Sequence, residues 1–347
     1  MTTETSEFSI NPKIGVGLVT FIYDQLFVTP KYPTQSVAGE TIIVTGANVG
    51  LGLETARHFY RLGCARMVLA VRTISKGQKA KENIVESIKQ RKDADAVEVW
   101  QLDLDSTDST LGFVRWVNAE LPRVDKVVEN AGINSRTWAT AEGFERNIQV
   151  NVVNTCLVAM ALLPKMTQTK ERYPDSLPTL TIVSSGAHRL TKFEEVNASD
   201  IYAQLNNEKS YKGGERYQIT KLLEILVVRE VVSRHSVANS GAPPVIINLA
   251  NPGLCTSELD RGVKSGAIVS FLRRWFERTT EVGARTLVLA ACAGFNSNGE
   301  SVVDGKIESV ESWIYTDMGQ RVQKKVFDQT LRILENRKPG IGAEAGL

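Results

Sequence analysis

The chain has 347 residues, of which 42% are hydrophobic and 23% charged, so it can bury a substantial core as one domain with additions. Its formal net charge of +2 and the lack of a long Lys/Arg run argue against nucleic acid as a partner. The four cysteines stand far apart, which fits neither a zinc or other metal site nor a disulfide framework, and favours reduced thiols in a cytoplasmic protein.

The N-terminal extension, residues 1–38, begins with the acidic sequence MTTETSEF, which is unlike the basic start of a secretory signal. The following run, IGVGLVTFIYDQLFV, is apolar, but Asp24 interrupts it and it is shorter than the roughly 20 residues that span a bilayer. We expect residues 14–28 to form an amphipathic segment packed on the body of the protein. The alternatives are peripheral membrane contact, which would make the cytoplasmic protein membrane-associated, or an interface in a homo-oligomer.

Apolar, β-rich runs alternate with helical patterns after a linker that is punctuated by Pro and Gly. Continuous apolar strands separated by helices indicate a parallel sheet that is covered on both faces. We therefore predict the α/β class: a doubly wound parallel sheet of the Rossmann type, in a single domain over residues 39–340 with helical extensions at both ends. The predicted strands are residues 41–45, 66–71, 97–102, 125–130, 179–184 and 244–250.

Two polar stretches, residues 187–216 and 254–281, break this alternation. Both follow the carboxyl ends of predicted strands, where ligands bind in such sheets, so we expect them to be substrate loops. Within the second, Leu272, Trp275 and Phe276 are candidates for an apolar substrate wall, with ordinary packing of an amphipathic helix as the equal alternative. The helical pattern at 317–336 indicates C-terminal packing or an interface, without visible chemistry.

The first predicted strand runs into TGANVGLG and then directly into a helix. Glycines at 46, 50 and 52 would let the backbone approach a pyrophosphate, while the helix N-terminus supplies amide donors and a positive dipole. The strand, turn and helix together predict a dinucleotide site that also includes Asn48 and Leu51. A tight turn without a ligand is the weaker alternative.

Tyr217 and Lys221 are separated by four residues in a helical pattern, which places a phenol and an ammonium on one face. The reference pKa of a phenol is about 10, and a neighbouring cation favours the phenolate. Such a tyrosine can act as a general acid or base near neutrality. Alone the spacing is common, and an exposed pair would be the ordinary interpretation.

In order along the chain, Thr45-Gly46 with the two later glycines, ENAG at 129–132, Asn151, VSSG at 183–186, the Tyr–Lys pair and NPGLCT at 251–256 resemble the motif series of the short-chain dehydrogenase/reductase family. The resemblance covers residues 41 to about 256. AVRTISKGQKA, SSGAH and the long polar insert before the tyrosine are more similar to the retinol-dehydrogenase-like branch and to its fungal members in secondary metabolism.

This resemblance implies a catalytic set of four side chains that converge over a nicotinamide. Ser185 would hydrogen-bond the substrate carbonyl, Tyr217 would donate the proton, and Lys221 would lower the pKa of the tyrosine and bind the ribose. Asn151 would hold a water that feeds the relay. Ser184 is the alternative to Ser185. His188, beside the serine strand, is expected to be structural.

The second strand ends in Arg72, where NAD-selective relatives carry an acid. Arg72, assisted by Lys76, can bind a 2′-phosphate, so we predict NADP (NADPH); a solvated strand-end cation is the alternative. Asp103 resembles the family residue that contacts the adenine, and an N-cap or loop aspartate is the alternative. Glu129 replaces an Asn of many relatives, and we expect this departure to leave the catalytic set unchanged. The predicted cofactor-binding residues are Gly46, Asn48, Gly50, Leu51, Gly52, Arg72, Lys76, Asp103, Leu104, Asn130, Ala131, Gly132, Tyr217, Lys221, Pro252, Gly253 and Thr256.

These features predict an NADPH-dependent carbonyl reductase, or the reverse secondary-alcohol dehydrogenase, which acts on a medium-sized apolar molecule resembling a polyketide or terpenoid. A redox-neutral cyclase or isomerase on the same fold is the first alternative. An NADP-sensing module ranks lowest, because a sensor needs no proton relay.

Overall fold

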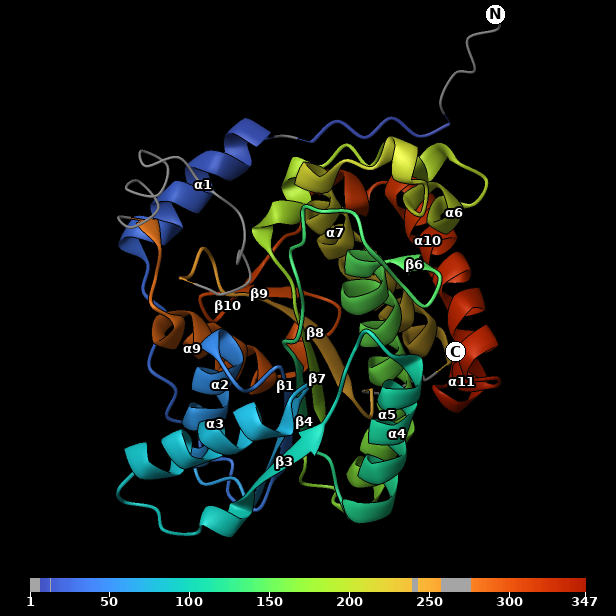
Figure 1. Ribbon diagram of the computed structural model, residues 1–347. Helices are drawn as coiled ribbons and strands as arrows, with labels where there is room; N and C mark the ends of the chain where they lie inside the picture. The colour runs from blue at the N-terminus through green and yellow to red at the C-terminus, as the bar shows by residue number, and fades with distance from the viewer. Residues whose placement is uncertain (1–6, 13, 239–242, 257–275) are drawn as a thin grey trace, which may run out of the picture.

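The computed structural model describes residues 7–12, 14–238, 243–256 and 276–347. Its centre is an eight-stranded sheet in the order β10-β9-β8-β7-β4-β1-β2-β3, in which the β9–β10 pair is antiparallel and the other pairs are parallel (Figure 1). The order from β3 to β8 is that of a doubly wound sheet, which confirms the predicted fold class. The strands are β1 (Thr41–Thr45), β2 (Arg66–Val71), β3 (Val97–Gln101), β4 (Lys126–Glu129), β7 (Thr179–Val183), β8 (Ile246–Asn251), β9 (Ser301–Val303) and β10 (Lys306–Glu308).

Helices cover both faces of this sheet, as Figure 1 shows. Strands β1, β4 and β7 are buried along their whole length, which explains why their sequences do not alternate with polar residues. One face carries α2 (Gly50–Arg61), α3 (Ile74–Ser87) and α9 (Thr280–Ala291), and the other carries α4 (Thr107–Glu120), α5 (Thr155–Arg172) and α7 (Gly213–Ala238). Each face has its own apolar core.

The remaining elements are short or terminal. The predicted C-terminal helix is α10 (Asp317–Arg337), which packs on α7 and is followed by α11 (Ile341–Glu344). The 187–216 stretch holds α6 (Ile201–Leu205) between 3₁₀ turns. The short elements are η1 (Ala94–Ala96), the hairpin β5 (Thr140–Ala141) and β6 (Phe144–Glu145), the π-helical η2 (Ile148–Asn154), η3 (Gly186–Leu190), η4 (Glu194–Asn197), η5 (Glu208–Ser210), η7 (Phe295–Ser297) and η8 (Ser312–Tyr315).

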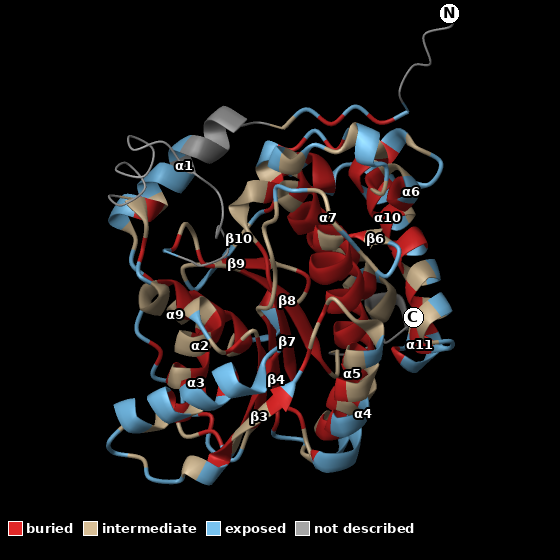
Figure 2. Ribbon diagram, in the orientation of Figure 1, coloured by how far each residue is buried: buried red, intermediate tan, exposed pale blue. Residues whose placement is uncertain are grey.

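The N-terminal extension contains α1 (Ile14–Phe27), a helix in the segment where one was expected. Much of its described surface is exposed, whereas α5 and α7 are mostly buried (Figure 2). One helical run, Ile148–Arg172, is apolar and long enough to cross a membrane. Since 83% of its most apolar window is buried inside the protein, it is a core helix.

Candidate active site

The glycine turn connects β1 to α2 at the carboxyl edge of the sheet. Gly46 and Gly50 have φ values of +64° and +63°, a left-handed conformation that favours glycine. A Cβ on Gly52 would lie 2.5 Å from the carbonyl oxygen of Gly46, so only glycine fits there. Val49 precedes α2, and no side chain among the described residues caps its position. The turn therefore offers close backbone approach and uncapped amides, which suit a pyrophosphate.

The ENAG turn is fastened to the glycine turn. The Thr45 hydroxyl accepts hydrogen bonds from the backbone N–H groups of Asn130, at 3.0 Å, and Ala131, at 2.9 Å. The Asn130 amide donates to the carbonyl of Thr45 at 3.0 Å. These contacts join the ends of β1 and β4, so two segments with predicted cofactor-binding residues form one rigid edge.

Asn151 lies in η2 and is held on both polar atoms of its side chain. Its Oδ1 accepts from the backbone N–H of Ile133 at 2.9 Å, and its Nδ2 donates to the Ile133 carbonyl at 2.8 Å. The same Nδ2 lies 3.1 Å from the Thr220 hydroxyl, which donates to the carbonyl of Tyr217 at 2.7 Å. The side chain of Asn151 thus links the β4 loop to the helix that carries Tyr217.

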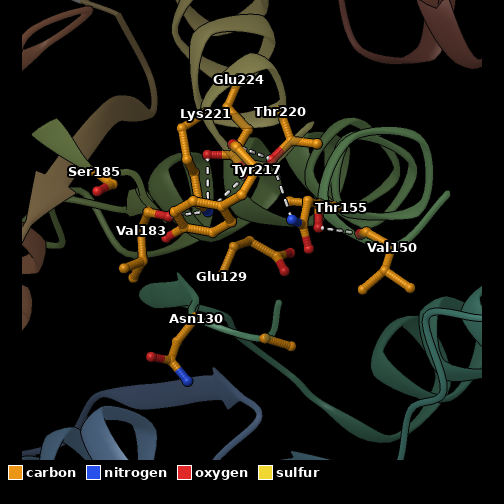
Figure 3. Close-up of polar contacts among 12 residues, drawn as sticks. Glu129, Asn130, Val150, Thr155, Val183, Ser185, Tyr217, Thr220, Lys221 and Glu224 are labelled. Carbon is orange, nitrogen blue, oxygen red and sulfur yellow. Dashed lines mark hydrogen bonds and ion pairs between the residues drawn. The ribbon is translucent and has the colours of Figure 1, made fainter. Parts of the chain in front are cut away.

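Tyr217 and Lys221 lie one turn apart on α7, and the Lys221 ammonium is 5.6 Å from the centroid of the tyrosine ring (Figure 3). Lys221 is buried, and its Nζ donates to the carbonyl of Val183 at the end of β7, at 2.8 Å. The ordinary interpretation of an exposed Tyr–Lys pair is therefore wrong for this helix.

Two buried acids accompany this pair, and the sequence prediction missed their importance. Glu224 accepts from Lys221 Nζ at 2.8 and 3.1 Å. Burial raises the pKa of Glu224 to about 7, although Lys221 acts against it. Burial tends to lower the pKa of Lys221, but Glu224 and Tyr217 together outweigh it, so this pKa is raised.

Glu129 ends β4 and Asn130 follows it; their side chains point to opposite sides, Glu129 toward α7 and Asn130 toward the glycine turn (Figure 3). Burial raises the pKa of Glu129 to about 8, and Glu224 contributes to the rise. One oxygen of Glu129 lies 3.4 Å from the Thr45 hydroxyl, and the other has no hydrogen-bond partner in the described part of the chain. The replacement of Asn by Glu therefore places a buried acid near Glu224 of α7. The expectation that it leaves the catalytic set unchanged stays a prediction.

Ser184 and Ser185 directly follow β7 and differ in burial and in hydrogen bonding. Ser184 is buried, and its hydroxyl has no partner among the described residues. Ser185 is half-buried and accepts from the backbone N–H of Ala187 at 3.2 Å. Its carbonyl lies 2.8 Å from Nδ1 of His188, whose Nε2 accepts from the N–H of Glu311 at 3.3 Å. Burial lowers the pKa of His188 to about 4, so this histidine is a neutral brace for the serine turn.

The predicted phosphate-binding cations lie at the end of β2. Arg72 is exposed over 60% of its side chain and lies 3.7 Å from Asp105, which is also held by Arg146 at 2.6 Å. Lys76, on α3, is exposed. Asp103 accepts from the backbone N–H of Asp105 at 3.1 Å in the loop after β3, where Ser106 is the N-cap of α4. Asp103 therefore lies in the loop and is not the N-cap, its contact with the adenine stays a prediction, and the side chain of Leu104 is buried.

The loop after β8 carries the last predicted contacts. Gly253 has φ +74°, and Pro252 is buried. Thr256 is exposed, and its hydroxyl lies 3.4 Å from Glu277. Leu272 and Trp275, two members of the predicted substrate wall, lie outside the described residues, while Phe276 is half-buried.

Gln25 of α1 binds this loop, a contact that sequence reasoning missed. Its amide Nε2 donates to the carbonyls of Leu254 and Phe276 at 2.7 and 2.5 Å, and its Oε1 accepts from the N–H of Leu254 at 3.0 Å. Arg278 donates to the carbonyls of Asp24 and Val28 at 2.7 and 2.9 Å. A polar residue in an apolar helix was the only signal in the sequence.

Comparison with known proteins shows which proteins this chain is similar to. A family profile described as short chain dehydrogenase matches residues 40–172. The short chain dehydrogenase/reductase dmxR8 of Cryptosporiopsis sp. is 41% identical over 92% of this chain and 98% of its own length. The short-chain dehydrogenase anuD of Penicillium roqueforti is 35% identical over 94% of this chain and 86% of its own.

Solved structures share the fold at lower identity. An uncharacterised protein from Mycobacterium paratuberculosis superposes with a TM-score of 0.63 at 23% identity, covering 87% of this chain and 96% of its own. A short chain dehydrogenase from Shigella flexneri, complexed with NADP, gives a TM-score of 0.54 at 17% identity, covering 78% of this chain and 100% of its own.

Proposed function

The chain belongs to the short-chain dehydrogenase/reductase family, and we propose that it is an NADPH-dependent carbonyl reductase or, in reverse, a secondary-alcohol dehydrogenase. Family membership makes it an oxidoreductase with a nicotinamide cofactor and a small-molecule substrate. The observation that carries the proposal is the pairing of half-buried Tyr217 with buried Lys221, whose ammonium binds the end of β7 next to Ser185.

The residues at the carboxyl edge of the sheet fit such a cofactor. The glycine turn and the uncapped start of α2 would hold the pyrophosphate, and the loop after β8 would contact the nicotinamide through Thr256. Arg72 supports the choice of NADPH, because it is exposed and its one ion pair among the described residues is a 3.7 Å contact with Asp105, which a phosphate could replace. When bound, the nicotinamide supplies the hydride.

The chain's own residues would handle the carbonyl and its proton. The Ser185 hydroxyl would donate a hydrogen bond to the carbonyl oxygen of the substrate, and the Tyr217 phenol would protonate this oxygen as negative charge develops on it. Lys221 would orient the phenol, and Asn151 would keep the β4 loop and α7 in register for the relay.

The substrate we propose is a medium-sized apolar ketone of polyketide or terpenoid type from fungal secondary metabolism. The similarity to dehydrogenases from fungi supports the source, and the separation between Ser185 and Tyr217 supports the size, because it leaves the 187–216 segment beside the site. Incubating the protein with NADPH and a metabolite extract from its source, then measuring product mass, tests this. A product heavier by two hydrogens is expected; an isomer of unchanged mass would favour the cyclase or isomerase alternative.

Tyr217→Phe tests the proposed proton donor. Since the variant keeps the ring but loses the hydroxyl, we expect turnover to fall at least about a hundredfold while NADPH binding, measured by fluorescence, is retained. Unchanged turnover would contradict the role of Tyr217.

We also propose that a cytoplasmic form of the protein contacts membranes peripherally through residues 14–28. Val19, Tyr23 and Phe27 of α1 are exposed by 70%, 60% and 72%. Replacing Tyr23 and Phe27 by Ser should abolish co-sedimentation with phosphatidylcholine/phosphatidylserine vesicles, whereas Tyr32→Ser, outside the helix, should not. Loss of a homo-oligomer in gel filtration without any vesicle binding would instead identify a subunit interface.

A further inference from the structure

The helix that carries the Tyr–Lys pair also carries a buried acid that the proposed mechanism does not use. Glu224 lies three residues after Lys221 on α7, and its side chain is only 2% exposed. Both of its oxygens lie within hydrogen-bond distance of Lys221 Nζ, at 2.8 and 3.1 Å. Because a buried carboxylate is costly unless it is paired, this contact determines where both side chains lie.

Lys221 Nζ is thereby held between two elements. It donates to the Val183 carbonyl at the end of β7 and to Glu224 on its own helix. β7 continues directly into Ser184 and Ser185, so the ammonium joins the helix of the proton donor to the strand of the carbonyl-binding serine. Figure 3 shows Tyr217 and Lys221 side by side with Glu224 behind them on the same helix.

This pairing changes the charge that the phenol experiences. An isolated ammonium near the ring would favour the phenolate, but the Glu224 carboxylate offsets it at close range. The other titratable groups that face this cluster are Glu129 from β4 and Cys156 from α5. Burial raises the pKa of both, so Cys156 stays neutral, whereas Glu129, with a pKa of about 8, ionises before an ordinary phenol does and is present in both backgrounds of the test below.

We propose that Glu224 is a positioning residue for the reaction: it holds Lys221 against the Val183 carbonyl and offsets the ammonium charge, so that Tyr217 stays protonated to higher pH. A phenol that keeps its proton is a donor, which favours carbonyl reduction over alcohol oxidation at neutral and mildly alkaline pH. This inference rests on the proposed function, because it takes Tyr217 as the proton donor.

The test is a spectroscopic titration of tyrosinate absorbance in the full-length protein. Subtracting the Tyr217→Phe titration isolates Tyr217 from the other tyrosines, in the unaltered and in the Glu224→Gln background. We expect the Tyr217 midpoint in Glu224→Gln to fall by about one pH unit, since one negative charge is removed at several ångströms. The pH profile of kcat/KM for reduction should lose its alkaline limb at correspondingly lower pH. An unchanged or higher midpoint would overturn the inference.

Glu230→Gln is the matched control. Glu230 lies on the same helix, about 20 Å along its axis from Tyr217, and pairs with Arg234 at 3.0 Å, so the Tyr217 midpoint should not move. Should Glu224→Gln fail to fold, Lys221→Met combined with Glu224→Leu removes both charges with apolar side chains of similar volume. The midpoint should then stay within about half a pH unit of the unaltered protein. A rise of the Tyr217 midpoint by more than about one pH unit would mean that Glu224 does not offset the charge of the Lys221 ammonium, and would reject the proposal.

The titration needs neither substrate nor cofactor, which separates the two proposals. If the protein reduces no carbonyl with NADPH, the proposed function fails while the effect of Glu224 on Tyr217 remains measurable. If reduction occurs but the Tyr217 midpoint is the same in Glu224→Gln as in the unaltered protein, only the positioning role fails.

Discussion

Helix α7 buries charged side chains, whereas helix α1 exposes apolar ones. In α7, an ammonium and a carboxylate are buried at Lys221 and Glu224, and each is the other's partner. In α1, Val19 and Phe27 are exposed while Gln25, a polar residue, is buried. The difference is that the buried charges of α7 pair next to the candidate catalytic Tyr217, whereas α1 combines polar contacts from Gln25 to the loop after β8 with an exposed apolar surface.

Lys221→Met should produce the largest effect, because it leaves the buried Glu224 without its partner. We expect the free energy of unfolding to fall by about 3–5 kcal/mol at alkaline pH, and less at low pH where Glu224 takes up a proton. Urea denaturation at several pH values measures this. Adding Glu224→Leu should restore most of the lost free energy of unfolding. If it does not, the unpaired Glu224 is not the cause of the destabilisation.

Glu129→Gln tests the second buried acid. The folded pKa of Glu129, about 8, lies above its ordinary value, so between these values the native state holds a proton that the unfolded chain has lost. Stability therefore falls as pH rises from about 4.5 toward 8. Gln does not titrate, so we expect this variant to be more stable at pH 8 by on the order of 3 kcal/mol and little changed at pH 5. Thermal unfolding across this range measures the difference, and parallel pH dependence in both proteins would contradict it.

Gln25→Ala tests whether α1 is part of the site. Since the variant removes three hydrogen bonds to the backbone of Leu254 and Phe276, we expect a loss of about 1–3 kcal/mol and a raised KM for NADPH with a smaller change in kcat. Gln320→Ala, at an exposed position of α10, is the control for a helical glutamine. An unaltered KM for NADPH would show that the contacts of Gln25 with Leu254 and Phe276 do not affect cofactor binding.

Phe27→Ala should have the smallest effect on folding. Its side chain is 72% exposed, so we expect the free energy of unfolding to change by less than about 0.5 kcal/mol. Phe327→Ala, at a fully buried position of α10, should cost about 3–5 kcal/mol in the same denaturation experiment. Comparable losses would mean that α1 packs against the body more closely than its exposure indicates.

Much of the fold was predictable because its signals are local. Buried strands such as TIIVT, the glycine turn and the Tyr217–Lys221 spacing each depend on a few consecutive residues, and all lie where the sequence indicated. The short strands β9 and β10 and the helix α9 were not predicted. A strand of three residues has too little periodicity to be recognised, and β9 exists because it pairs with β8.

The sequence by itself determined the doubly wound sheet, the glycine turn and the Tyr217–Lys221 spacing, since periodicity, glycine geometry and helical spacing act over one or two turns of chain. Asn151 and Ser185 were named from the resemblance to the family's motif series. Only the tertiary structure decided which buried acids lie near these side chains. Glu129 meets α7 because β4 ends opposite it, and Gln25 reaches Leu254 across a separation of 229 residues. Such contacts depend on the path of the whole chain, and the burial that shifts the pKa of an acid arises only when distant elements close over it.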